Sequence, residues 1–209
     1  MTEPRLYLVT PPLAAPGEGA AAFAAAAASG AVACALVRLA TNEPGQRKAV
    51  ARAVCDILQP AGVAVVVEND TQLAGRAEAD GVHVAGAGEA LAAALKSMRP
   101  KRIVGVGRLT SRDEAMEAGE AEPDYLMFGE PAADGFVHPL DWRVERAGWW
   151  SEIFNVPCVA YAAEAGDVAA LAEAGADFVA LGPWLFAEAD PAATLKRAAA
   201  DIAAAPARA

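Results

Sequence analysis

The stretch Val65-Val66-Val67-Glu68-Asn69-Asp70, together with the later stretch Asp80-Gly81-Val82-His83-Val84, decides the fold of this chain. Each contains a short apolar run of the kind that predicts a buried strand. Each also carries polar residues that a buried strand rarely has: an Asn-Asp pair closes the first, and a histidine lies in the second. Polar groups at the carboxyl ends of parallel strands form the sites of α/β folds. The two stretches therefore indicate an α/β fold and the end of it that carries a site.

Apolar runs alternate with helical patterns along the whole chain. The runs show no apolar-polar alternation, as expected for strands that are buried on both faces. Eight such units in 209 residues predict one domain, 1–209, folded as a closed (β/α)₈ TIM barrel, with an open doubly wound sheet as the alternative. The expected strands are Leu6–Val9, Ala35–Leu39, Val63–Val67, Gly81–Val84, Arg102–Val106, Tyr125–Phe128, Cys158–Tyr161 and Phe178–Leu181. The expected helices are Gly19–Ser29, Gly45–Leu58, Thr71–Ala79, Glu89–Met98, Arg112–Gly119, Trp142–Phe154, Asp167–Ala174 and Ala192–Ala204.

The composition excludes several classes of partner. A formal net charge of −10 disfavours binding to nucleic-acid phosphates and to acidic lipid surfaces. No apolar run reaches the roughly 20 residues that a membrane span requires. The alanine tract at 20–28 predicts a helix, and it lacks the basic start of a signal peptide. Three widely spaced cysteines fit neither a disulfide framework nor a zinc site. We therefore expect a cytoplasmic protein with buried thiols that binds neither nucleic acid nor membranes.

Two residues at the expected strand ends stand out by their chemistry. Arg38 lies within an apolar run, where a charge needs either a structural partner or a ligand, and both interpretations stay open. For His83 we expect a hydrogen-bonded, nearly buried imidazole rather than a catalytic base, because the sequence identifies no acidic or nucleophilic partner for it.

The tryptophans leave two further questions open. Trp184 is expected to pack under a terminal helix, and the alternative is that it fills a pocket at the end of the barrel. Trp142, Trp149 and Trp150 lie near one face of a predicted helix. That face either packs on the barrel or forms an interface between copies of the chain, so a homo-oligomer is one of the two expectations.

Several of these residues follow the order of motifs in a known family. The chain resembles the thiamine phosphate synthase and thiazole tautomerase (TenI-like) superfamily over about Arg5 to Ile202. The resemblance rests on the order and spacing of the motifs rather than on any one of them. The matching positions are Leu6-Tyr7-Leu8-Val9-Thr10 in the first strand, Arg38 in the second, Asn69-Asp70, Asp80-Gly81-Val82-His83, Gly105-Val106 with Thr110, and Gly175-Ala176-Asp177 before the last strand.

The resemblance implies a (β/α)₈ fold and a coupling reaction. A synthase of this kind joins a hydroxymethylpyrimidine diphosphate to a thiazole phosphate, with Mg²⁺ on the diphosphate, and releases pyrophosphate. The implied partner is thus an anionic small molecule and the implied cofactor Mg²⁺, while the catalytic residues stay unassigned. The resemblance implies Arg38 and Asn69 for the diphosphate and Asp70 for the metal. We also expect His83, Arg108 and Thr110 at the substrate, and Ala163 and Gly182 at the phosphate.

The chain departs from the family pattern around the diphosphate. Two lysines and one carboxylate are missing, although a pyrophosphate leaving group needs nearby cations to stabilise its developing charge. Arg108 is a candidate replacement for one lysine. The departures are Leu36 and Ala40 at a Gln and a Lys of the second-strand motif, Gly88 at a second metal Asp, Gly107 at a Ser, and Gly129-Glu130-Pro131-Ala132-Ala133-Asp134-Gly135 at a Thr-x-Thr-Lys loop.

Other parts of the pattern differ as well. Leu109 stands at the catalytic His of the tautomerase branch and cannot transfer protons. Ala162-Ala163 stands at a Gly-Gly pair, and Pro183 has no N–H to offer a phosphate. We therefore expect a synthase-like protein of thiamine biosynthesis with a degraded set of motifs. The alternatives are a divergent paralogue that binds a phosphorylated or thiazole- or pyrimidine-like ligand without coupling, and a non-catalytic regulatory barrel.

Overall fold

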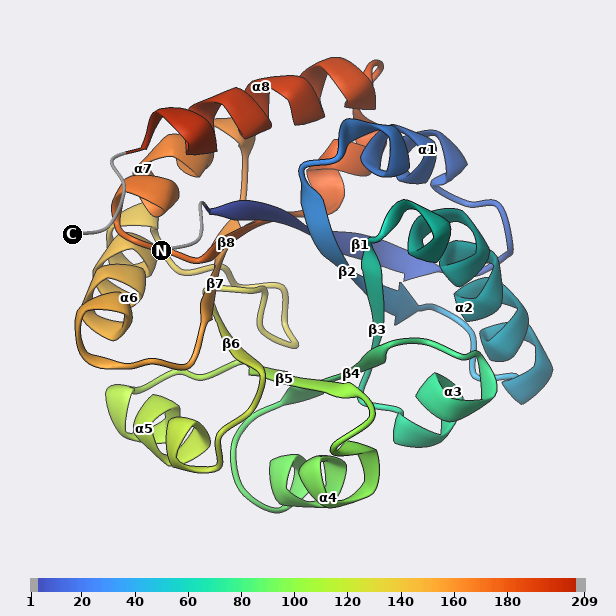
Figure 1. The fold of residues 1–209 in the computed structure, drawn as a ribbon, viewed down its shortest axis with the longest axis horizontal. Helices are drawn as coiled ribbons and strands as arrows, with labels where there is room; N and C mark the ends of the chain where they lie inside the picture. The colour runs from blue at the N-terminus through green and yellow to red at the C-terminus, as the bar shows by residue number, and fades with distance from the viewer. Residues whose placement is uncertain (1–3, 206–209) are drawn as a thin grey trace.

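The computed structural model describes residues 4–205 and shows a closed barrel of parallel strands (Figure 1). Each strand pairs with the next along the chain, and β8 pairs with β1. This order confirms the predicted (β/α)₈ TIM barrel and excludes the open doubly wound sheet. The strands are β1 Arg5–Leu13, β2 Val32–Leu39, β3 Ala64–Glu68, β4 Gly81–Ala85, β5 Ile103–Gly107, β6 Tyr125–Phe128, β7 Cys158–Ala162 and β8 Phe178–Leu181.

The helices follow the strands and form a ring around the barrel (Figure 1). Because each helix returns the chain to the same end, the loops that follow the strands all gather at the carboxyl end of the barrel. The α-helices are α1 Ala20–Ser29, α2 Pro44–Leu58, α3 Thr71–Arg76, α4 Glu89–Met98, α5 Arg112–Glu120, α6 Leu140–Ile153, α7 Val168–Glu173 and α8 Pro191–Ala204. Short 3-10 helices are η1 Gln59–Ala61, η2 Ala165–Asp167 and η3 Pro183–Ala187.

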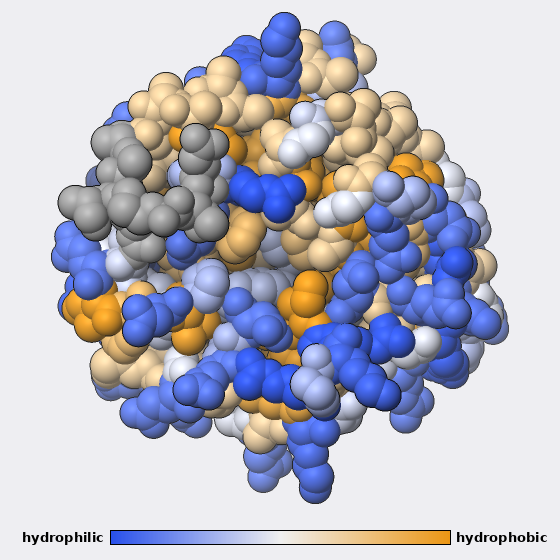
Figure 2. Space-filling view, in the orientation of Figure 1, coloured by the Kyte–Doolittle hydropathy of each residue, from blue (hydrophilic) through white to orange (hydrophobic). Residues whose placement is uncertain are grey.

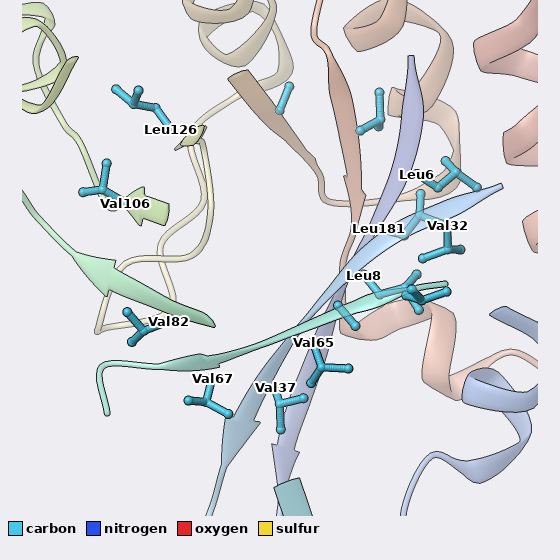
Figure 3. Close-up of a cluster of buried hydrophobic side chains, with 14 of the residues drawn as sticks. Leu6, Leu8, Val32, Val37, Val65, Val67, Val82, Val106, Leu126 and Leu181 are labelled. Carbon is cyan, nitrogen blue, oxygen red and sulfur yellow. The ribbon is translucent and has the colours of Figure 1, made fainter. Parts of the chain in front are cut away.

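Successive strand side chains enter two different cores. Val65 and Val67 of β3 join the layer between strands and helices, whereas Val66 between them belongs to the cluster inside the barrel. Figure 3 shows the outer layer, where Val37 of β2 lies near Val67 and Val65 of the neighbouring strand. Both faces of the strands are therefore apolar, which explains why their sequences show no polar alternation.

The first strand is longer than the sequence predicted, and the added part supports the site. β1 continues through two prolines to Leu13, whereas we expected it to end at Val9. Its pairing with β2 shifts register between Val9 and Pro12. Within this irregular part the hydroxyl of Thr10 accepts a hydrogen bond from the backbone N–H of Arg38 at 2.9 Å. A side chain thus supplies the acceptor where the regular ladder is interrupted.

The third helix is shorter than predicted. α3 ends at Arg76, three residues before the expected end at Ala79. Glu78 adopts a left-handed conformation with φ 57°, which a helix interior does not accommodate. The chain then enters β4 through Asp80, whose carboxylate accepts a hydrogen bond from the Val65 N–H at 2.7 Å. This contact aligns the starts of β3 and β4.

The face of the molecule drawn in Figure 2 has a polar area and an alanine-rich area. Figure 2 shows hydrophilic residues over the lower and right side of this face, and a pale, mildly apolar area over α1 and α8. Both helices are rich in alanine, and small side chains let them pack closely. None of the helices within residues 4–205 is long and apolar enough to cross a bilayer.

Candidate functional site

A buried carboxylate lies at the carboxyl end of the barrel. Glu130 follows β6 by two residues, and only 1% of its side chain is exposed. Its Oε2 accepts a hydrogen bond from Arg38 Nη2 of β2 at 2.9 Å, and its Oε1 lies 3.2 Å from His83 Nε2 of β4. Glu130 thus joins two of the predicted site residues across the barrel. It is also the acidic partner of His83 that the sequence did not reveal.

A second carboxylate joins Arg38 to Arg108. Glu68 is the last residue of β3, and its Oε1 lies 3.3 Å from Arg38 Nε and 2.9 Å from Arg108 Nη2. Arg108 directly follows β5. We call the five residues Arg38, Glu68, His83, Arg108 and Glu130 the mouth cluster. Two guanidinium groups and two carboxylates balance each other, so the cluster has no formal net charge when His83 is neutral.

Two features of the mouth cluster point to a ligand. The Nε atoms of Arg38 and Arg108 are buried without a hydrogen-bond partner in the part of the chain that the structure describes. Buried donors are almost always paired in folded proteins, so such atoms call for water or a ligand beside them. Arg108 also has a left-handed backbone with φ 54°, which costs a non-glycine residue about 1–2 kcal/mol. Backbone strain of this kind concentrates at functional sites.

The electrostatics of the mouth cluster keep Glu130 ionised. Burial by itself would raise the pKa of the Glu130 carboxyl. His83, Arg38 and Arg108 act in the opposite direction and together hold this pKa below its ordinary value of 4.5. Glu130 is therefore an anion at neutral pH and a weak base.

His83 connects the mouth cluster to a pair of tyrosines inside the barrel. Its Nδ1 lies 2.9 Å from the Tyr125 hydroxyl, which in turn lies 2.7 Å from the Tyr7 hydroxyl. Burial is the largest influence on both tyrosines and raises the pKa of each hydroxyl well above 10, so both stay neutral. Both ring nitrogens of His83 therefore have partners, as expected of a satisfied, nearly buried imidazole.

Asn69 and Asp70 lie at the same end of the barrel, but their side chains bond to nearby parts of the protein. Asn69 has φ 52°, and its Oδ1 accepts a hydrogen bond from the Ala85 N–H at 2.9 Å, which links the ends of β3 and β4. Asp70 caps α3 by accepting from the Leu73 N–H at 2.8 Å, and its other oxygen lies 3.1 Å from Arg47 Nη2. Both carboxylate oxygens of Asp70 are thus already engaged by the protein.

The residues present do not fit a Mg²⁺ ion held by the protein alone. Each oxygen of the implied ligand Asp70 already has a protein contact, and the second position expected from the family is Gly88, which has no carboxylate, with Glu89 next to it. Over residues 4–205 there is no group of three or more His, Cys, Asp or Glu side chains that could hold a metal ion.

The remaining predicted contacts are also engaged within the protein. Thr110 donates its N–H and its hydroxyl to the Glu114 carboxylate, at 2.7 and 2.8 Å, and so helps to start α5. The N–H of Ala163, expected to face a phosphate, donates to Asp167 at 2.8 Å. Gly182 is enclosed, because a Cβ there would lie 2.4 Å from the Tyr161 hydroxyl oxygen. Their predicted roles in substrate and phosphate binding stay predictions.

Trp184 lies over the ends of β7 and β8. Its indole Nε1–H donates to the backbone oxygen of Ala162 at 2.9 Å, and its ring packs partly buried against the outer core. A Cβ on Gly182 would lie 3.1 Å from Trp184 Cδ1. The indole therefore covers the backbone where a phosphate was expected to bind.

An ion pair that the sequence did not indicate lies beside the mouth cluster. Arg143 of α6 is buried, and its Nη1 lies 2.8 Å from Asp167 Oδ2 and 2.7 Å from the backbone oxygen of Tyr161. Its Nε donates to the backbone oxygen of His138 at 3.0 Å. These contacts tie α6 to the end of β7 and to η2. No local pattern predicts them, because the partners are separated by 24 residues.

The three tryptophans of α6 have different environments. Trp150 is fully buried and stacks on Phe154 with 4.0 Å between ring centroids. Trp142 and Trp149 are half-buried, and the guanidinium group of Arg146 lies over both rings, at 5.0 and 5.9 Å. Packing on the barrel accounts for Trp150, whereas an interface between copies stays a prediction for the outer pair.

Comparisons with known proteins bear on the family and the fold. The family model described as thiamine monophosphate synthase matches residues 6–183. The thiamine-phosphate synthase of Rhodospirillum centenum is 38% identical over 192 residues, which cover 88% of this chain and 91% of that protein. The thiamine-phosphate synthase of Thioalkalivibrio sulfidiphilus is 32% identical over 201 residues, which cover 93% of each.

Solved structures show the same architecture. Thiamine phosphate pyrophosphorylase from Pyrococcus furiosus has a TM-score of 0.78 at 20% identity over 95% of each chain. A 3-hexulose-6-phosphate synthase has a TM-score of 0.71 at 21% identity, over 94% of this chain and 99% of the other. At these identities the likeness concerns the fold, whereas the family model and the sequence relatives identify the family. The chain belongs to the thiamine monophosphate synthase family.

Proposed function

We propose that this protein binds the phosphorylated substrates of thiamine phosphate synthesis at the mouth cluster and couples them slowly. These substrates are a hydroxymethylpyrimidine diphosphate and a thiazole phosphate. The observation that carries the proposal is the convergence of Arg38 and Arg108, from different strands, on one oxygen of Glu68. The Nε atoms of both guanidinium groups are buried without a hydrogen bond among residues 4–205, and that of Arg38 has only the 3.3 Å ion-pair contact with Glu68. Guanidinium groups recognise phosphate oxygens with matching geometry.

Slow coupling follows from the charges around the leaving group. The synthase reaction releases pyrophosphate, so cations must stabilise negative charge as it develops. Leu36, Ala40 and the segment 129–135 offer no such group, and the two arginines present are already paired with Glu68 and Glu130. Removing one charge-stabilising group typically costs about 10²–10³ in rate.

Mg²⁺ enters this proposal together with the diphosphate. The ion usually keeps several waters and binds through substrate phosphates and one or two carboxylates. Because the oxygens of Asp70 already contact Leu73 and Arg47, the protein alone has no unengaged set of ligands arranged for the ion. The proposal also includes a reducing cytoplasm, which suits three buried cysteines.

A coupling assay tests the proposal. Purified protein is mixed with hydroxymethylpyrimidine diphosphate, thiazole phosphate and Mg²⁺, and thiamine phosphate is quantified over time. We expect product at well below about 1 turnover per second, the lower end of the ordinary enzyme range. Arg38→Ala should abolish the residual turnover, whereas Glu188→Gln, which changes one exposed carboxylate after η3, should leave it unchanged. Turnover within the ordinary range of about 1–10³ per second would contradict the proposal.

The second candidate function is ligand binding without coupling. It is favoured by Glu130, whose buried carboxylate pairs with Arg38, a cation that a synthase would use on its diphosphate. Isothermal titration with each substrate separates the two functions. Saturable binding of the phosphorylated ligands with no thiamine phosphate after prolonged incubation would identify a binding protein.

A further inference from the structure

We propose that Glu130 is a resident anion of the mouth cluster: its carboxylate holds the place of a ligand's anionic group, and an incoming phosphate or diphosphate binds by displacing it. This inference rests on the part of the proposed function that places an anion at Arg38. It adds that the protein regulates access to that place with one of its own side chains.

The contacts of Glu130 are those that an anion would make. One oxygen accepts from the Arg38 guanidinium at 2.9 Å, and the other lies 3.2 Å from His83 Nε2. Charge-assisted contacts of this kind recognise phosphate as well as carboxylate oxygens. A phosphate and Glu130 cannot both occupy this place, because like charges side by side in a buried site repel each other strongly. Exchange of one anion for the other keeps Arg38 paired throughout.

Gly107 shows that the barrel makes room for this carboxylate. A Cβ on Gly107 would lie 2.0 Å from Glu130 Oε1 and 2.6 Å from His83 Nε2. The backbone does not require glycine at this position, since Gly107 is a strand residue outside the set of glycines with positive φ. The absence of a side chain at position 107 therefore leaves room for the Glu130 carboxylate.

The segment that carries Glu130 allows the carboxylate to leave. Residues 129–139 connect β6 to α6 without regular structure, and Gly129 has φ 80°. The atom nearest to a Cβ at 107 is the end of a flexible side chain, so rotation about its χ angles is enough to clear the place. The free energy spent on moving Glu130 lowers the apparent affinity for the incoming anion.

Titration calorimetry with inorganic pyrophosphate tests the inference. We expect Glu130→Gln to bind pyrophosphate at least about tenfold more tightly than the unmodified protein, because the competing charge is gone. Glu188→Gln removes the same charge from an exposed position and should change the affinity by less than about twofold. Thermal unfolding of each variant checks that the fold is kept. Equal or weaker pyrophosphate binding by a folded Glu130→Gln variant would overturn the inference.

Gly107→Ser probes the same place from the other side. A Cβ at 107 would lie 2.0 Å from Glu130 Oε1 and 2.6 Å from His83 Nε2, so the serine occupies the space that the carboxylate or an incoming phosphate oxygen needs. This variant should therefore bind pyrophosphate more weakly than its parent, both alone and in the Glu130→Gln background. Pyrophosphate binding as tight as that of Glu130→Gln would contradict displacement at this place.

The outcomes separate this inference from the proposed function. Tighter pyrophosphate binding by Glu130→Gln without any coupling supports the resident anion and rejects the synthase. Slow coupling with unchanged pyrophosphate affinity in Glu130→Gln supports the synthase and rejects the resident anion. If neither the unmodified protein nor the folded variants bind pyrophosphate, the resident anion is wrong.

Discussion

Two arginines near the carboxyl end of the barrel meet carboxylates in different ways. Arg143 is buried and donates to Asp167 and to two backbone oxygens, and Asp167 accepts two further backbone N–H groups. Arg38 is partly buried and donates to Glu130, while its Nε makes only a 3.3 Å ion-pair contact with Glu68 that is not a hydrogen bond. The contacts of Arg143 include the main chain, whereas the guanidinium contacts of Arg38 are with side chains.

The difference distinguishes an arginine that holds the fold from one that holds a ligand. A closed network in low dielectric is costly to break, because removing one member leaves the other charge buried and unpaired. A guanidinium group with fewer hydrogen bonds to the protein has more N–H donors available for a ligand. Location alone does not separate the two, since both arginines lie at the end of the barrel where sites are built.

The largest expected effect on stability belongs to Arg143. Replacement by methionine leaves Asp167 buried without its cation, so the free energy of unfolding should fall by about 3–5 kcal/mol. Urea unfolding measures this loss. Arg112→Met breaks a half-exposed ion pair with Glu145 and should cost about 1 kcal/mol or less. If Arg143→Met lowers the free energy of unfolding no more than Arg112→Met does, the Arg143–Asp167 pair does not hold the fold as argued.

Substitution of the two mouth-cluster arginines should have an intermediate effect, which is a loss of affinity for pyrophosphate. Arg38→Lys keeps the charge but loses the planar fork, so affinity for pyrophosphate should fall about tenfold. Arg108→Ala should weaken binding by about 10–100-fold, as expected for a lost charge-assisted hydrogen bond. Titration calorimetry measures both, and urea unfolding is measured alongside. Unchanged affinity together with lower stability would make both arginines structural, like Arg143.

The smallest expected effect is the contribution of Glu130 to acid stability. His83, Arg38 and Arg108 overcome the effect of burial and hold the folded-state pKa of Glu130 below its ordinary 4.5. A depressed carboxyl pKa stabilises the folded state above the unfolded-state value, and this contribution is lost as pH falls through the folded-state value.

This linkage is measured by urea unfolding between about pH 6 and about pH 3. The unmodified protein should lose stability more steeply with falling pH than Glu130→Gln, which has no carboxylate to titrate at that position. Parallel pH profiles for the two proteins would show that Glu130 gains no stabilisation from its cationic neighbours.

The fold could be predicted because its signal is local and repeated. Each strand is an apolar run and each helix has a periodic face, so the closed barrel followed from their order. The errors concern the ends of elements, where the local sequence does not show how the chain pairs in three dimensions. Two prolines suggested that β1 ends at Val9, but a register shift and the Thr10 hydroxyl carry the pairing on to Leu13.

The site could be predicted only in part. Arg38, His83 and Arg108 were expected at one end of the barrel because each lies at or just after an apolar run, and the structure brings them together. Glu130 also follows an apolar run, but its pairing with His83 and Arg38 was not foreseen. It lies on an irregular segment without periodicity, and these partners lie 47 and 92 positions away in the chain.

Gly107 and Glu130 also bear on how freely the mouth of this barrel can change its sequence. A Cβ at 107 would lie 2.0 Å from Glu130 Oε1 and 2.6 Å from His83 Nε2, so any larger residue there must displace a neighbouring side chain. Positions 107 and 130 therefore constrain each other, and a larger residue at 107 requires a different arrangement at 130.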